Sequence, residues 1–363
     1  MLEAKRLSNA VRLEFEPGAL VHANLSGAAV TGEWLWVAGD EACAVDRLRR
    51  LDKLGGETLR FGGGQSFPLS DLLDLPGEPD EEADLEGMDV SEGFLWIVGS
   101  HGFKRRNAKA ARSDAENAKR LTKVKLDGNR RLLACLPIEQ GSSGEPGLVR
   151  LASDGRRALR LKGDAVDNVL TTLLADDPHF GAYMAIPGKD NGFDIEGLAV
   201  DGNRLLLGLR GPVLRGWSAL LEIAVEPKGD YLQMVPLDGN GTLLRKHFLQ
   251  LGGLGVRDLH LSGDDLYLLA GPTMVLNGEI RLFKWPQARK IIAANLEPVR
   301  FERSLTESVE LPHGEGCNRA EAICDVPPEL LGGKQSWLVL YDAPGPDRTD
   351  GECSVYGDLL LRG

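Results

Sequence analysis

The sequence contains no run of 18 apolar residues, so no transmembrane helix is expected. Residues 1–10 carry charges and include no apolar segment of the kind found in secretory signals. Basic residues are too few to balance the acidic ones, and the formal net charge is −12 with a pI of about 5.1. Nucleic-acid-binding domains are usually basic. These absences predict a cytoplasmic protein with neither a membrane nor a nucleic acid as partner.

Cysteine is scarce, and the familiar catalytic motifs are missing. The five cysteines are odd in number and scattered, with no second pair at metal-ligand spacing, which predicts free thiols. The chain has no G-x-S-x-G, no H-E-x-x-H, no P-loop and no G-x-G-x-x-G after a strand. No nucleotide cofactor is therefore expected.

Glycine is abundant, with 45 residues, and the chain repeats itself. Residues 84–90 with 95–99 match residues 194–200 with 205–210 almost position for position, and weaker copies begin near residues 25, 256 and 320. Each copy contains a short strand, a Gly/Asp turn and a nearly continuous apolar strand, which is typical of a hairpin buried on both faces. Sheets stacked face to face as the blades of a propeller bury strands in this way.

The repeat predicts an all-β fold, a single β-propeller domain over residues 1–363. The first mouth position of each copy is Ser26, Glu86, Glu196, Arg257 or Glu321, so the spacings are 60, 110, 61 and 64 residues. Five blades are predicted, and the long gap leaves six as the alternative. That gap holds a basic insert at 104–125 and a helical insert at 164–176, for which Asp164 is the expected cap.

Further strands complete each blade. Segments 218–225 and 231–236 follow the Glu196 hairpin, and segments 279–285 and 299–303 follow the Arg257 hairpin. Segment 11–15 alternates like a strand, and 358–361 ends the chain. Because a circular fold must remove its free edges, these two terminal strands are predicted to close the ring within one blade.

Acidic side chains gather at one predicted mouth of the channel. Glu86, Glu196 and Glu321 would repel one another unless something neutralises them. A hard cation such as Ca²⁺ or another divalent ion is one resolution, with these three glutamates as ligands. Pairing with arginines at the same mouth is the other. Either reading competes with a simple capping role for each glutamate.

Basic residues around this mouth are candidates for holding a small anionic ligand. The predicted substrate-binding set is Lys104, Arg210, Arg215, Arg257 and Arg348. His101 is the candidate general base. A tight turn with solvated arginines at 210–217, and a solvated loop at 104–125, are the structural alternatives. The insert contains no aromatic residue after Phe103, which argues against stacking on single-stranded nucleic acid.

The pattern Asp-Ile-Glu-Gly-Leu-Ala at 194–199, with Leu209-Arg210-Gly211-Pro212, resembles the bacterial domain-of-unknown-function family number 3616. It resembles more distantly the propeller family labelled esterase-like activity of phytase. The first resemblance implies the fold, and the second implies a hydrolase of phosphate or carboxyl esters.

Two functions follow as hypotheses. The first is a metal-assisted hydrolase of a small anionic ester, with the cation polarising the ester and activating water. The second is a non-catalytic scaffold that binds a small ligand or a protein partner. An intact acid cluster with a divalent metal favours the first hypothesis, whereas a mouth filled by Arg–Glu pairs contradicts it. The sequence leaves the oligomeric state open.

Overall fold

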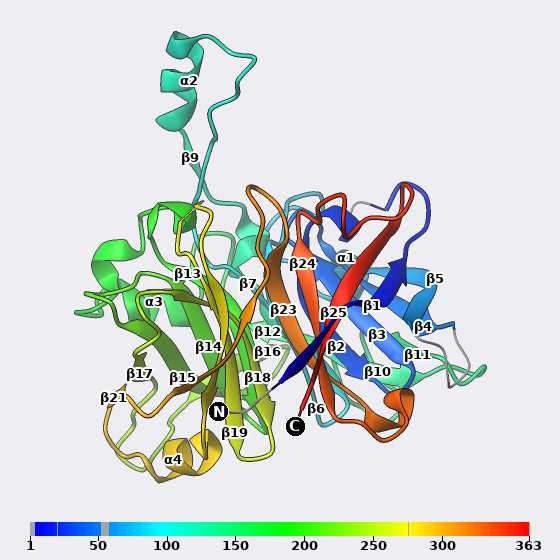
Figure 1. Cartoon of the computed structure of the whole chain (residues 1–363). Coiled ribbons are helices and arrows are strands. Elements are labelled where there is room, and N and C mark those ends of the chain that lie inside the picture. Colours follow the sequence, from blue (N-terminus) through cyan, green and yellow to red (C-terminus); the bar gives the residue numbers. More distant parts are fainter. Residues whose placement is uncertain (1–3, 20, 52–57, 275, 363) are drawn as a thin grey trace.

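Strands make up most of the regular secondary structure in the computed structural model, which describes residues 4–19, 21–51, 58–274 and 276–362 (Figure 1). They pair into five antiparallel units, and each unit contains one of the predicted hairpins. Unit 1 consists of β2 (Leu25–Thr31), β3 (Trp34–Gly39), β4 (Ala44–Arg50) and β5 (Leu59–Pro68). Unit 2 consists of β6 (Leu85–Ser91), β7 (Phe94–Gly99), β10 (Leu133–Gln140) and β12 (Leu159–Leu161), with β11 (Pro146–Leu148) on β10.

The later units follow the same plan. Unit 3 consists of β13 (Asp194–Asp201), β14 (Arg204–Gly211), β15 (Ser218–Lys228) and β16 (Tyr231–Val235), and β17 (Arg245–Leu249) also pairs with β15. Unit 4 consists of β18 (Gly255–Ser262), β19 (Asp265–Gly271), β20 (Ile280–Trp285) and β22 (Thr306–Leu311). Unit 5 consists of β23 (Arg319–Val326), β24 (Ser336–Asp342), β25 (Ser354–Leu361) and β1 (Lys5–Glu14). The fold is therefore all-β and propeller-like.

The first hairpin strand of every unit lies on the inside. These inner strands, β2, β6, β13, β18 and β23, contact one another in that cyclic order, and β23 contacts β2. Side chains fasten neighbours together: the Asp89 carboxylate accepts from the Val200 amide at 2.8 Å, and Asp258 accepts from the Ile323 amide at 2.8 Å. Ser26 donates to the Leu85 carbonyl in the same manner.

Five apolar clusters form the core, one between each pair of neighbouring units. The second hairpin strands are buried on both faces because their alternate side chains enter different clusters. In β14, for example, Leu205 and Leu207 pack against unit 2, whereas Leu206 packs against unit 4. This arrangement explains why the sequence of these strands is continuously apolar rather than alternating.

The two ends of the chain pair within unit 5. Strand β1 runs antiparallel to β25, from Lys5 opposite Leu361 to Glu14 opposite Ser354, with a register shift between Leu7 and Val11. Its other edge pairs in parallel with β5. Next to this pairing, the Arg348 guanidinium donates two hydrogen bonds to the Asp358 carboxylate, at 2.7 and 2.9 Å. Asp358 also accepts from the Tyr341 hydroxyl at 2.8 Å and from the Asn9 amide at 2.9 Å.

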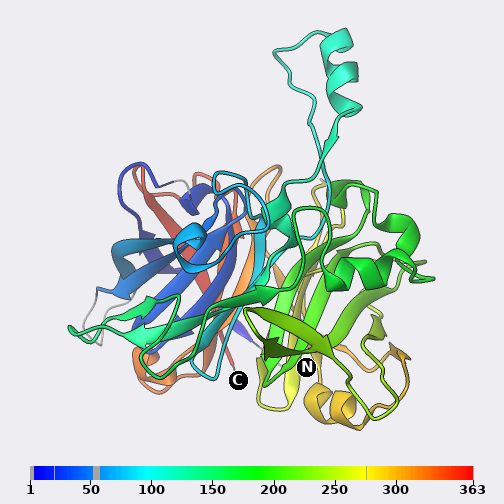
Figure 2. The ribbon, with the colours of Figure 1, turned by 180° about the vertical axis from the view of Figure 1, so that it is seen from behind.

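Short helices lie in the connections between strands. They are α1 (Leu69–Leu72), α2 (Asp114–Leu121), α3 (Val169–Ala175) and α4 (Ala288–Ala294), with 3-10 turns at Val21–Ala23, Gly128–Arg131, Gly181–Tyr183, Gly188–Asp190 and Pro328–Leu331. The basic insert is an arm that stands clear of the body, with α2 above the two-stranded pairing of β8 (Lys104–Arg105) and β9 (Val124–Lys125) (Figures 1 and 2). Among the described residues, no helix is long and apolar enough to cross a membrane. All five cysteines are free.

Two local predictions were wrong. The helix of the 164–176 insert begins only after Asn168, whose side chain accepts from the amides of Leu170 and Thr171, both at 3.0 Å. Asp164 instead accepts from the Val166 amide in the preceding turn. Segment 299–303 is not a strand of unit 4: β21 (Val299–Glu302) pairs with β17 of unit 3, and β22 takes the outer position in unit 4.

Candidate functional site

Each inner strand carries a β-bulge near its beginning. The pairing register of the five hairpins skips one residue there, and the skipped residues are Ser26, Glu86, Glu196, Arg257 and Glu321. These are the five positions that the repeat placed at the mouth. A bulge redirects the side chain of the extra residue out of the regular pleat. The repeated bulge therefore brings four of these side chains to one cavity, at the end of the ring where the inner strands begin.

This mouth cavity has a volume of about 40 Å³ and is lined almost entirely by charged groups. Its carboxyl groups come from Asp40, Glu86, Glu196, Glu321 and Asp342, and its cationic groups come from Lys189, Arg210, Arg257 and Arg319. Met274 and Leu276 supply apolar contact. A space of this size holds a few waters or the head group of a small ligand.

Two arginines neutralise much of the acidic charge. The Arg210 guanidinium contacts both Asp194 and Glu196. Arg257 contacts Glu321, lies 3.5 Å from Glu196 and donates to the Pro272 carbonyl at 3.0 Å. Burial raises the pKa of Glu196, and the two guanidinium groups oppose that rise. The mouth thus shows the second arrangement that the sequence allowed, in which arginines pair with the glutamates.

The predicted metal ligands Glu86, Glu196 and Glu321 do not fit a divalent cation. Two of the three are in contact with guanidinium groups, whose positive charge repels a second cation at the same carboxylates. Across the described residues, no group of three or more His, Cys, Asp or Glu side chains is arranged to hold a metal ion.

Two carboxyl groups of the cavity have no ion pair or side-chain hydrogen bond within the described chain. Glu86 is 6% exposed, and burial raises its pKa well above the usual range, with the carboxyl of Glu196 acting in the same direction. Asp40 has a buried Oδ1 without a hydrogen-bond partner. Burial and then the carboxyl of Asp84 raise the pKa of Asp40 to about 7, while Lys189 opposes the rise. Glu86 therefore favours its protonated form more than an exposed glutamate does, and Asp40 is about half ionised at neutral pH.

Lys189 brings an ammonium group to this cavity from the turn Gly188–Asp190. Burial and the charge of Arg210 lower its pKa, but the carboxyl groups of the cavity outweigh them and the net pKa is raised. Within the described chain Lys189 forms no ion pair, unlike Arg319, which lies 3.2 Å from Asp342. Burial also raises the pKa of Asp342, to about 6. Lys189 is the cation best placed to receive a ligand anion.

Several predicted residues lie elsewhere. His101 is fully buried: its Nδ1 lies 2.8 Å from the Gly99 carbonyl and its Nε2 lies 2.8 Å from the Asn168 amide nitrogen. Burial lowers the pKa of His101 to about 3, so the ring is neutral and fixed between these partners. Its position matches a structural histidine rather than a base in the mouth cavity, which it does not line.

The three remaining basic candidates also fall outside the mouth cavity. Arg348 is 3% exposed, pairs with Asp358 and lies over the Tyr341 ring at 3.7 Å. Arg215 is exposed in the loop after β14. Lys104 pairs with Glu82 at 2.5 Å, at the base of the arm. Of the predicted substrate-binding set, the structure brings only Arg210 and Arg257 to the cavity.

Comparisons with known proteins give a family and several distant structures. A family model described as "Protein of unknown function (DUF3616)" matches residues 24–358. A search of curated proteins finds no match. Among solved structures, a glutaminyl cyclase from Myxococcus xanthus aligns with 9% identity and a TM-score of 0.41, covering 100% of this chain and 99% of that chain. The PQQ-bound aldose sugar dehydrogenase of Streptomyces coelicolor aligns with 14% identity and a TM-score of 0.37, covering 100% and 99%. A GH32 β-fructofuranosidase from Bombyx mori aligns with 13% identity and a TM-score of 0.36, covering 93% and 59%.

Proposed function

We infer the function from the site itself, because this chain belongs to DUF3616, a family described as a protein of unknown function. We propose a hydrolase that acts on a small anionic ester at the mouth cavity through its own carboxyl groups, in place of the metal-assisted hydrolase that the Arg–Glu pairs contradict. The observation that carries the proposal is the combination, in one cavity, of two carboxyl groups that form no ion pair in the described chain and an ammonium group. These are Asp40, Glu86 and Lys189.

We assign the two carboxyl groups opposite roles, with Asp40 ionised and Glu86 protonated. Ionised Asp40 accepts a proton from water, whose oxygen forms the new bond to the acyl carbon or the phosphorus of the ester. Protonated Glu86 donates its proton to the alkoxy oxygen as that oxygen leaves. The products are an acid and an alcohol, and the proton on Asp40 returns to Glu86 through solvent. An environment that separates the pKa values of two neighbouring groups is a common basis for acid and base catalysis.

The cations supply recognition of the substrate. Lys189 has no ion-pair partner in the described chain and faces the cavity, so it holds the anionic group of the ester. The Arg319 side chain is a third exposed and forms its ion pair with Asp342, so it adds a second positive charge beside Lys189 for the anionic group. Arg210 contacts Glu196, and Arg257 contacts Glu321, so these pairs hold the wall of the cavity in place.

The test uses p-nitrophenyl phosphate and mono-4-nitrophenyl succinate as substrates for the full chain. We expect turnover above the uncatalysed rate, with a pH profile that has an inflection near the pKa of Asp40, about 7. Asp40→Asn should lower kcat by about 100-fold or more and remove that inflection, in line with loss of a general base. Lys189→Met should mainly raise KM.

The exposed pair Asp80→Asn and Lys290→Met provides matched controls with the same changes of charge. Both controls should keep the activity of the original chain. The proposal is refuted by a lack of turnover on both esters, or by turnover that Asp40→Asn and Glu86→Gln leave unchanged.

We further propose that the five units are the five blades of one propeller domain, closed where β1 pairs with β25. The cyclic contacts of the inner strands and the five apolar clusters between units support this proposal.

A second candidate function is a scaffold for an acidic partner, which the basic arm favours. Residues 104–125 contain nine basic and two acidic residues, a formal charge of +7, in a chain whose total is −12. Helix α2 buries none of its residues, and the arm projects away from the body (Figure 2). Chemical cross-links to an acidic protein that start from Lys109 or Lys119 would support this candidate. Cross-links that persist in a chain lacking residues 107–122 would contradict it.

A further inference from the structure

Two adjoining cavities lie between units 2 and 3, away from the mouth. The larger has a volume of about 520 Å³ and includes the hairpin turns at Glu92 and Gly202, so it opens at the opposite end of the inner strands. The smaller has a volume of about 250 Å³. Arg157 and Leu159 line both cavities, so the two cavities adjoin at these residues. The larger volume lies within the range of small-molecule sites.

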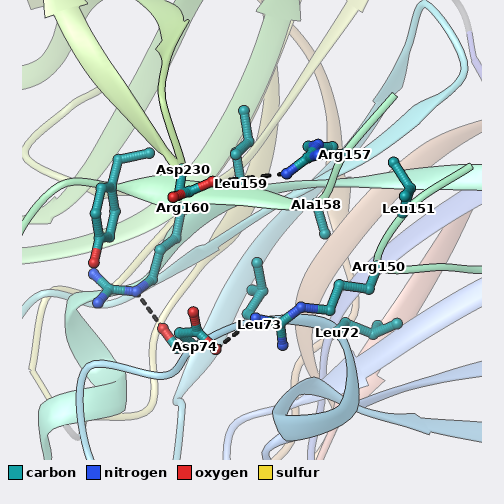
Figure 3. Close-up of a pocket in the computed structure, with 11 residues that line it drawn as sticks. Leu72, Leu73, Asp74, Arg150, Leu151, Arg157, Ala158, Leu159, Arg160 and Asp230 are labelled. Atoms are coloured by element: carbon teal, nitrogen blue, oxygen red, sulfur yellow. Dashed lines mark hydrogen bonds and ion pairs between the residues drawn. The ribbon is translucent and has the colours of Figure 1, made fainter. Parts of the chain in front are cut away.

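The smaller cavity gathers three guanidinium groups (Figure 3). Arg160, on β12, is 8% exposed and lies over the Tyr231 ring at 5.1 Å. The Arg160 guanidinium donates hydrogen bonds to three backbone carbonyls, those of Gly163 at 2.9 Å, Leu161 at 3.2 Å and Asp74. Within the described chain no carboxylate forms an ion pair with Arg160, and burial lowers its pKa. A buried cation without a counter-charge favours an anionic ligand.

The other two arginines are available to such a ligand. Arg157 lies 3.7 Å from Asp230, with 59% and 83% of the two side chains exposed. Arg150 pairs with Asp74 at 2.5 Å, and both side chains are more than half exposed. In Figure 3, Arg150 and Arg160 approach Asp74 from opposite sides, while Arg157 points to Asp230. Exposed pairs of this kind contribute little stability, so a bound anion can replace the aspartates.

The larger cavity is apolar and aromatic where the smaller one is charged. Phe94 and Trp96 of β7 lie in its wall with ring centroids 6.5 Å apart, and Val225 and Leu232 line it from unit 3. Arg156 lies over the Phe94 ring at 5.4 Å and is held by Asp154 at 2.7 Å. Such a wall suits a flat aromatic ring system, which stacks on aromatic side chains and leaves water.

We propose that the two adjoining cavities form a binding site for an aromatic anion. Its ring system packs on Phe94 and Trp96, and its negatively charged group meets Arg157, which lines both cavities, with Arg160 beyond it in the smaller cavity. The site is separate from the mouth cavity, so this proposal does not depend on the hydrolase proposal.

The test is a titration of the full chain with 8-anilinonaphthalene-1-sulfonate, an aromatic anion whose fluorescence rises in apolar surroundings. We expect saturable binding of one molecule per chain, with energy transfer from tryptophan. Arg157→Glu should weaken binding by about tenfold or more through loss of a charge-assisted contact. Arg215→Glu, an equal charge change at an exposed arginine outside both cavities, should leave the affinity unchanged.

Two further measurements separate this site from adventitious binding. Trp96→Phe should remove much of the energy transfer while circular dichroism shows the same Tm. N-phenyl-1-naphthylamine, which lacks the sulfonate, should bind more weakly to the original chain and equally to the Arg157→Glu chain. The proposal is overturned if binding is not saturable, if Arg157→Glu and Arg215→Glu behave alike, or if Trp96→Phe keeps the full energy transfer.

Discussion

Replacing Asp40 by asparagine should stabilise the protein above neutral pH and leave it unchanged at acidic pH. The pKa of Asp40 is raised to about 7, so its folded form takes up a proton that the unfolded chain has already lost. A group with a raised pKa contributes stability at low pH, and that contribution is lost as the pH rises through the folded value. The folded and unfolded pKa values of Asp40 differ by roughly three units, which corresponds to about 4 kcal/mol of unfolding free energy. Because Asp40 partly reaches solvent, we expect Asp40→Asn to raise the free energy of unfolding by about half of that amount at pH values above about 8.

The assay is thermal unfolding followed by circular dichroism at about pH 4, near the unfolded pKa, and at about pH 8.5, above the folded pKa. For a chain of this length, about 2 kcal/mol corresponds to a rise in Tm of roughly 3 °C at the higher pH. Asp80→Asn, an equal change at an exposed position, should shift Tm at neither pH. An Asp40→Asn protein that is less stable at the higher pH, or equally shifted at both, would refute the burial argument.

Three other predictions follow from the structure. Asp358→Ala should lower the free energy of unfolding by about 3–5 kcal/mol in urea titrations, because Arg348 is left buried without its counter-charge; a loss under about 1 kcal/mol would contradict this. Adding calcium or a chelator should leave Tm unchanged, since arginines hold Glu196 and Glu321; a calcium-dependent rise that Glu196→Ala abolishes would restore the metal assignment. Replacing residues 107–122 by two glycines should change the free energy of unfolding by less than about 0.5 kcal/mol, measured in the same titrations, because α2 buries nothing; a larger loss would reveal packing of the arm on the body.

The repeat was visible in the sequence because packing demands it. Gly87 and Gly197, which follow the bulge residues, lie where a side chain would meet the next inner strand: a Cβ at Gly87 would come within 2.9 Å of Leu198, and one at Gly197 within 2.8 Å of Leu259. Close approach of the inner strands therefore fixes glycine beside a charged residue. The apolar second strands are fixed in the same way by burial on both faces. These constraints act on short segments, so they leave a readable pattern.

The chemistry of the mouth left a weaker signal. Lys189 comes from a short turn outside every repeat, and only the tertiary fold brings it to the cavity. Asp40 directly follows β3, but its raised pKa depends on burial, which a loop sequence does not encode. His101 follows the end of β7 as a mouth residue would, yet a positive φ of 57° and the partner Asn168 turn it inward. Long-range contacts decided each of these outcomes.

The position of β1 has a consequence for synthesis on the ribosome. Its antiparallel partner β25 lies far downstream of it in the chain, so at about 5–20 residues per second β1 waits between roughly 20 and 70 s for it. The parallel pairing of β1 with β5 gives one of its edges a partner much earlier, since Val11 meets Leu59. The nascent chain thus carries one open strand edge, rather than two, while the rest of the protein is being translated.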